Sequence, residues 1–91
     1  MSKIFTLQTR AIKAAQEERW ADAIALNQEL LNLDPRNIGA LNRTGFAFLQ
    51  QQAHKEAALA YQQVLELDSS NTVAKKYLEV IKKKQPVKLP K

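Results

Sequence analysis

Residues 18–37 read ERWADAIALNQELLNLDPRN, and 34 positions later residues 52–71 read QAHKEAALAYQQVLELDSSN. The two segments stay in register along their whole length, and the identical pairs are Ala23 and Ala57, Gln28 and Gln62, Leu31 and Leu65, Leu33-Asp34 and Leu67-Asp68, and Asn37 and Asn71. A fixed period of about 20 to 50 residues is the sequence signature of stacked structural repeats. The chain is therefore expected to be built from one small unit that occurs twice.

The spacing of apolar residues within each segment predicts helices. In residues 20–33 they recur at three- and four-residue intervals, as on the buried face of a helix. Asp34-Pro35 predicts a stop, because the residue before a proline disfavours the helical region. Ser2 and Asn37 are good N-cap residues, and Asp68-Ser69-Ser70-Asn71 repeats the stop and the cap 34 residues later. Five helices are expected: at about 3–17, from Trp20 to the Asp34-Pro35 stop, from the Asn37 cap to a break near Ala53, at about 55–67 and at about 72–84.

Composition excludes several kinds of chemistry. The 91 residues contain no cysteine, so disulfides, thiolate metal sites and cysteine nucleophiles are ruled out. His54 is the only histidine, and the two glycines, Gly39 and Gly45, do not form a phosphate-binding loop. Neither catalysis nor a cofactor or metal is expected. The first residues lack the apolar core of a signal peptide, and no run approaches a membrane span, so a cytoplasmic protein is the default expectation.

The net charge of +5 is distributed unevenly along the chain. Residues 1–74 hold seven Lys and Arg against eight Asp and Glu, whereas residues 75–91 hold seven lysines and only Glu79. The excess of positive charge therefore belongs to the C-terminal end. This pattern predicts either a solvated helix end or a salt-dependent contact with a polyanion such as a ribonucleoprotein, for which the candidate residues are Lys82, Lys83, Lys84 and Lys88.

With its 34-residue period and paired helices, the chain resembles the tetratricopeptide repeat, a helix-turn-helix unit of 34 residues. The residues that match its pattern of small, aromatic and large positions are Leu7, Ala23, Pro35, Leu41, Gly45, Phe48, Ala57 and Tyr61. The resemblance implies an all-α solenoid of five antiparallel helices. Repeats are expected at about 4–37 and 38–71, with a capping helix at 72–84 that completes a domain of residues 1–84, and a flexible basic tail at 85–91.

The resemblance also implies a function in protein-protein interaction. Proteins of this family bind peptides or protein segments in a concave groove lined by the first helix of each repeat. In this chain the predicted groove residues are Phe5, Gln8, Thr9, Ile12, Asn42, Arg43, Phe46, Leu49, Val73, Lys76, Tyr77 and Val80. Aromatic residues there are suited to anchor a partner, and basic residues to meet its carboxylates. The alternative is that Phe46 and Tyr77 pack only against each other.

One subclass of the family grips the C-terminal carboxylate of chaperone tails with Lys, Asn and Arg residues. The corresponding positions here are Gln8, Ile12, Arg43, Val73 and Tyr77, of which only Arg43 is basic. This mode of binding is therefore not expected. A stack of two repeats also leaves apolar end faces, which allows a homo-oligomer that pairs those faces.

Overall fold

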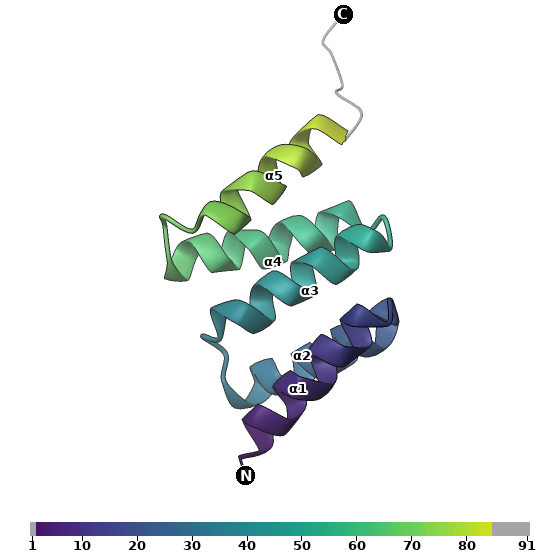
Figure 1. Cartoon of the computed structure of the whole chain (residues 1–91). Helices are drawn as coiled ribbons and strands as arrows, with labels where there is room; N and C mark the ends of the chain where they lie inside the picture. Colours follow the sequence, from purple (N-terminus) through teal and green to yellow (C-terminus); the bar gives the residue numbers. More distant parts are fainter. Residues whose placement is uncertain (1, 85–91) are drawn as a thin grey trace, which may run out of the picture.

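The computed structural model describes residues 2–84 and shows an all-α chain. Its five helices are α1 (Lys3–Gln16), α2 (Trp20–Leu33), α3 (Ile38–Gln50), α4 (His54–Leu67) and α5 (Thr72–Lys84). Each helix packs on the next one in the sequence, and α1 and α5 lie at opposite ends of the stack (Figure 1). This arrangement confirms the predicted fold class, a helical solenoid.

The three predicted asparagine and serine caps begin three of the helices. The Ser2 hydroxyl accepts a hydrogen bond from the Phe5 amide at 3.1 Å. Asn37 Oδ1 accepts from the Ala40 amide at 2.9 Å, and Asn71 Oδ1 accepts from the Ala74 amide at the same distance. Each cap satisfies a backbone N–H that has no partner inside its own helix, and this fixes the helix start.

The turns between the paired helices repeat at the same 34-residue interval. Glu18 and Gln52 both adopt left-handed backbone conformations, with φ of 58° and 64°. After each of them the chain closes back on the preceding helix, with the Arg19 amide 2.8 Å from the carbonyl oxygen of Ala14 and the Ala53 amide 2.9 Å from that of Phe48. The repeat seen in the sequence is thus also a repeat of backbone geometry.

The loops between the repeats are equally alike. The Asn37 side-chain amide donates to Asp34 Oδ2 at 3.1 Å, and the Asn71 amide donates to Asp68 Oδ2 at 3.3 Å. In both loops the asparagine backbone N–H also lies 3.1 Å from the carbonyl oxygen of the aspartate. The Asp-x-x-Asn sequence therefore shapes these loops, even though Pro35 in the first is replaced by Ser69 in the second.

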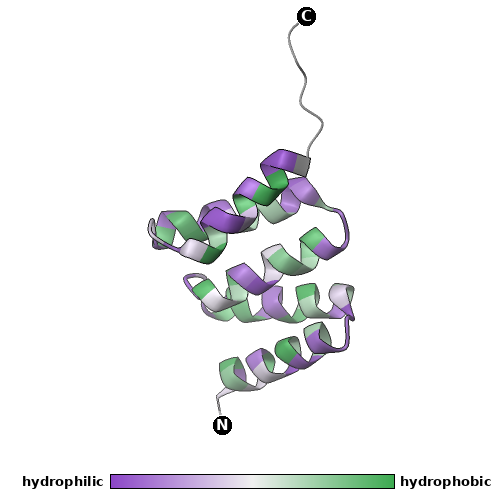
Figure 2. Ribbon diagram, turned by 45° about the horizontal axis from the view of Figure 1, so that its top comes forward, coloured by the Kyte–Doolittle hydropathy of each residue, from purple (hydrophilic) through white to green (hydrophobic). Residues whose placement is uncertain are grey.

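The core is built from small residues that let the helices approach closely. Hydrophobic and hydrophilic positions alternate along every helix (Figure 2), as expected of helices buried on one side. Alanines dominate the fully buried positions, which include Ala11, Ala14, Ala23, Ala40, Ala47, Ala57 and Ala74. The one large ring among the fully buried side chains, Tyr61, lies directly over Gly45. This contact explains the glycine in the middle of α3.

Helix α5 packs on α4 with its apolar side inward. Ala74 and Ile81 are buried and Leu78 is half-buried, whereas Lys75, Glu79 and Lys82 are exposed. The apolar side of α5 thus packs on α4. The predicted tail at 85–91, including Lys88, lies outside the described residues.

Candidate interaction surface

The predicted groove residues lie on α1, α3 and α5, and we call this surface the α1–α3–α5 face. Phe5, Val73 and Ile12 expose 52%, 44% and 36% of their surface, which is high for large apolar side chains. Thr9 and Lys76 are also exposed, and the half-buried members of the set are Gln8, Asn42, Arg43, Phe46, Tyr77 and Val80. Leu49 is only 7% exposed and belongs to the core.

A row of four aromatic rings connects the repeats. The rings of Trp20 and Phe46 meet edge to face with centroids 5.7 Å apart, and those of Phe46 and Tyr77 do so at 5.8 Å. Tyr77 in turn stacks on Tyr61 at 5.4 Å, and Lys76 Nζ lies 5.6 Å from the Tyr77 ring centroid. Phe46 and Tyr77 therefore pack against each other while both remain half-exposed. Each is held in a defined position by the row.

Arg43 is the most unusual charged residue of this face. Its Nε donates to Asn27 Oδ1 at 3.1 Å, and Asn27 is fully buried, with its own amide donating to the Ala23 carbonyl oxygen. Arg43 Nη2 is buried and has no hydrogen-bond partner among the described residues. Burial lowers the pKa of the guanidinium because it disfavours the charged form.

The role of Asn27 is one that sequence reasoning missed. Asn27 stands 34 residues before Tyr61, at the position where the second repeat has its buried ring. A polar residue at a buried position of the repeat needs a hydrogen-bond partner. The alignment of the two repeats was therefore the available signal, although it did not identify Arg43 as that partner.

Charge is segregated between the two kinds of helix. Helices α1 and α3 carry only basic charges, namely Lys3, Arg10, Lys13 and Arg43, and α5 carries five lysines with Glu79 as its one acid. By contrast, α2 has two acidic residues and no Lys or Arg, and α4 has Lys55 against Glu56 and Glu66. The excess of positive charge is thus spread over all the helices that carry the predicted groove residues, in addition to the C-terminal end.

Three hollows in the described surface lie away from the predicted groove residues. One of about 610 Å³ between α1 and α2 is lined by Arg10, Lys13, Glu17, Arg19, Asp22, Ala25 and Leu26. Two smaller ones lie over α2, α3 and α4 and between α4 and α5. None of these three contains a predicted groove residue, so the predicted groove itself stays a prediction.

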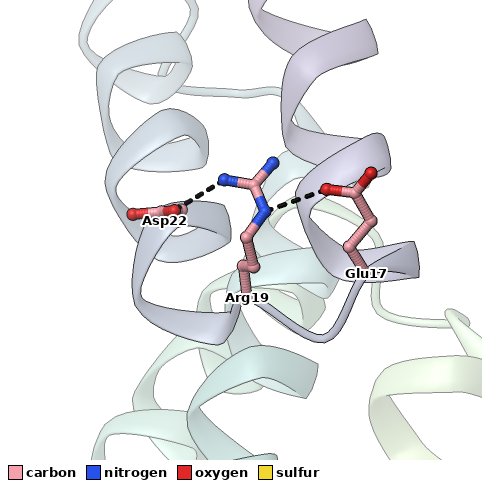
Figure 3. Close-up of polar contacts among 3 residues, drawn as sticks. All are labelled: Glu17, Arg19 and Asp22. Atoms are coloured by element: carbon pink, nitrogen blue, oxygen red, sulfur yellow. Dashed lines mark hydrogen bonds and ion pairs between the residues drawn. The ribbon is translucent and has the colours of Figure 1, made fainter.

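The polar cluster beside the hollow between α1 and α2 is a local structural feature. Arg19 bridges the two helices of the first repeat: its Nε lies 2.9 Å from Glu17 Oε1, and its Nη1 lies 2.7 Å from Asp22 Oδ2 (Figure 3). The hydrogen bonds to Glu17 and then Asp22 raise the pKa of Arg19. Because all three groups satisfy one another, they offer little to a ligand.

Other kinds of site have little support. Within residues 2–84 no group of three or more His, Asp and Glu side chains could hold a metal ion, and no helix of that part is long and apolar enough to cross a membrane. Of the predicted polyanion-binding lysines, Lys82 and Lys83 are exposed, and Lys84 is the last residue of α5.

Comparison with known proteins shows a distant and partial similarity. No protein-family model matches the chain. The chain is 31% identical over 74 residues to Sperm-associated antigen 1 of Mus musculus. This similarity covers 81% of the chain but only 8% of that much longer protein. The chain is thus similar to one segment of it, and its five sequentially packed helices are consistent with tetratricopeptide-like repeats.

Proposed function

We propose that this chain is a protein-protein interaction module of the tetratricopeptide type, which binds a peptide or protein segment on its α1–α3–α5 face. The observation that supports the proposal most is the combination of exposed Phe5, Ile12 and Val73 with the half-exposed rings of Phe46 and Tyr77. Exposed apolar side chains beside rigidly held aromatic rings are the usual anchors of a binding surface.

Affinity capture from a cell extract tests this function. The intact chain is compared with a Phe46→Ala, Tyr77→Lys variant and with a Phe5→Ala, Val73→Lys variant. The second variant changes only exposed side chains and should keep its fold. Leu59→Ala is the matched control, because Leu59 is 56% exposed but lies on α4. The expected result is a discrete partner that both double variants lose and the control keeps, with helical circular dichroism in all four proteins. Capture that survives both double variants would contradict the proposal.

A second candidate is association of the lysines at the end of α5 with a polyanion. Lys82 and Lys83 are exposed and form no ion pair with any residue that the structure describes. Replacing Lys82, Lys83 and Lys84 with glutamine should remove a salt-sensitive association with single-stranded nucleic acid. Absence of binding by the intact chain at low salt would exclude this candidate.

Self-association through the ends of the stack also stays a prediction. Light scattering across a dilution series tests it, since a monomer at every concentration rules it out.

A further inference from the structure

We propose that the segment bound on the α1–α3–α5 face is acidic, and that Arg43 receives one of its side-chain carboxylates. The inference rests on the proposed function, because it specifies the chemistry of the partner that this face would take. Three independent observations carry it. They are the incomplete pairing of the Arg43 guanidinium, the charges of the predicted groove residues, and the exposed apolar side chains on the same face.

The guanidinium of Arg43 is held in position but incompletely paired. One of its nitrogens is used by buried Asn27, Nη2 is buried without a partner, and no Asp or Glu in the described part of the chain lies within 4 Å of it. A partly buried cation without a carboxylate partner favours binding of an anion at a nitrogen that stays accessible.

The backbone next to Arg43 leaves room at the third guanidinium nitrogen, Nη1. A Cβ placed on Gly39 would lie 3.2 Å from Arg43 Nη1, so the missing side chain keeps this side of the guanidinium open. Nη1 makes no hydrogen bond within the described residues and is not among their buried polar atoms, so it is the group that an incoming carboxylate reaches.

The surrounding charges favour an acidic partner. No acidic residue occurs in α1 or α3, whereas the outer helices α2 and α4 each contain two. Among the predicted groove residues two are basic, Arg43 and Lys76, and none is acidic, so this set of residues attracts an acidic segment. Two cations on different helices, Arg43 on α3 and Lys76 on α5, suit side-chain carboxylates spaced along a segment better than one C-terminal carboxylate.

Apolar residues distinguish the segment from a nucleic acid. Phe5, Ile12 and Val73 offer aliphatic and aromatic surface to apolar side chains placed among the carboxylates. One face of the Tyr77 ring is already stacked on Tyr61, and the Phe46 ring contacts two neighbouring rings. These rings are less open than the stacking platforms that unpaired bases use.

Selection from a library of random twelve-residue peptides tests the inference. One arm displays the peptides followed by a fixed linker, and a second arm displays them with a free C-terminus. The proteins compared are the wild type, Arg43→Gln, and Arg36→Gln as a control that removes one exposed positive charge from the loop before α3. Arg43→Lys is included because it keeps the charge but lacks the planar guanidinium, and thermal melting verifies that every variant is folded.

The wild type and Arg36→Gln are expected to enrich peptides with Asp or Glu next to apolar residues in the linker arm. Arg43→Gln should keep the apolar preference and lose the acidic one. For a selected peptide, changing its acidic residue to the amide should weaken binding to the wild type by about tenfold and leave binding to Arg43→Gln nearly unchanged, with Arg43→Lys between the two.

Other outcomes would overturn the inference. If the wild type selects apolar peptides without acids, the acidic partner is wrong while the proposed function stands. The inference is also wrong if peptides are selected only in the arm with a free C-terminus. It is wrong as well if Arg36→Gln has the same effect as Arg43→Gln, or if single-stranded nucleic acid binds the same face more tightly than any peptide. If no peptide is selected in either arm, both the inference and the proposed function fail.

Discussion

The ring of Tyr61 occupies the space that a side chain on Gly45 would need. A Cβ at Gly45 would lie 2.8 Å from two carbons of this fully buried ring. The glycine costs helix propensity in the middle of α3, so its presence is explained by the approach of α4. The contact joins the two helices of the second repeat and supports the row of aromatic rings that ends at Trp20.

Gly45→Ala should therefore destabilise the protein although alanine is the better helix former. Overpacking a buried contact costs roughly 1–3 kcal/mol, and this outweighs a gain in helix propensity of about 1 kcal/mol. Chemical denaturation measures the difference. Gly39→Ala is the control, because Gly39 is exposed and its nearest neighbour is the flexible end of Arg43. An alanine that is tolerated equally well at both positions would show that the ring of Tyr61 can move aside.

Tyr61→Phe is expected to leave the free energy of unfolding unchanged or to increase it by about 1 kcal/mol. The Tyr61 hydroxyl is buried without a hydrogen-bond partner among the described residues, so its desolvation is not compensated. Burial, and then the neighbouring Tyr77, raise the pKa of this hydroxyl. The measurement is again chemical denaturation. A clear loss of stability would mean that the hydroxyl has a partner in solution.

Gln52→Gly should stabilise the protein by roughly 0.5–1 kcal/mol. Gln52 has a φ of 64°, a conformation that glycine adopts without the steric cost of a side chain. Gln51→Gly is the matched control. Gln51 has a φ of −87°, so there the glycine should only lower stability by enlarging the freedom of the unfolded chain. Thermal melting should separate the two variants in opposite directions. Glu18, with a φ of 58°, should respond to glycine in the same way as Gln52.

Asn27→Ala should destabilise the protein by about 1–3 kcal/mol, because it leaves Arg43 Nε without its acceptor in a partly buried site. Asn32→Ala, at an exposed position of the same helix, should change stability by far less. If the two substitutions have equal effects, the hydrogen bond between α2 and α3 contributes little to stability.

The hydrogen bonds of Asp68 predict a pH dependence of stability. Ser70 and then Asn71 donate to this carboxylate and lower its pKa in the folded state. The resulting stabilisation is complete above the unfolded-state pKa of about 4 and is lost as the pH falls through the folded-state pKa. Asp68→Ala should therefore melt below the wild type at neutral pH, and the two melting temperatures should converge on acidification. Glu66→Ala, at an exposed position of α4, should show no such convergence.

Local sequence signals were sufficient to predict the helices. The caps at Ser2, Asn37 and Asn71 and the apolar spacing placed every described helix to within a few residues, because both act through neighbours in the chain. The 34-residue period predicted the stacking, since one helix pair of this pattern cannot bury its own apolar side.

Tertiary structure decided the features that depend on contacts between distant residues. The hydrogen bond between Arg43 and Asn27, the unpaired Nη2 of Arg43 and the edge-to-face contact of Trp20 with Phe46 join different helices. The geometry of these contacts depends on how closely the helices approach each other. Small residues such as Gly45 and Ala11 permit a close approach, but they do not by themselves set the distance. By itself the sequence determined a repeated helical hairpin and which side of each helix is apolar. Packing across the repeats decided which of its side chains remain exposed, buried or unpaired, because those properties belong to pairs of surfaces rather than to single residues.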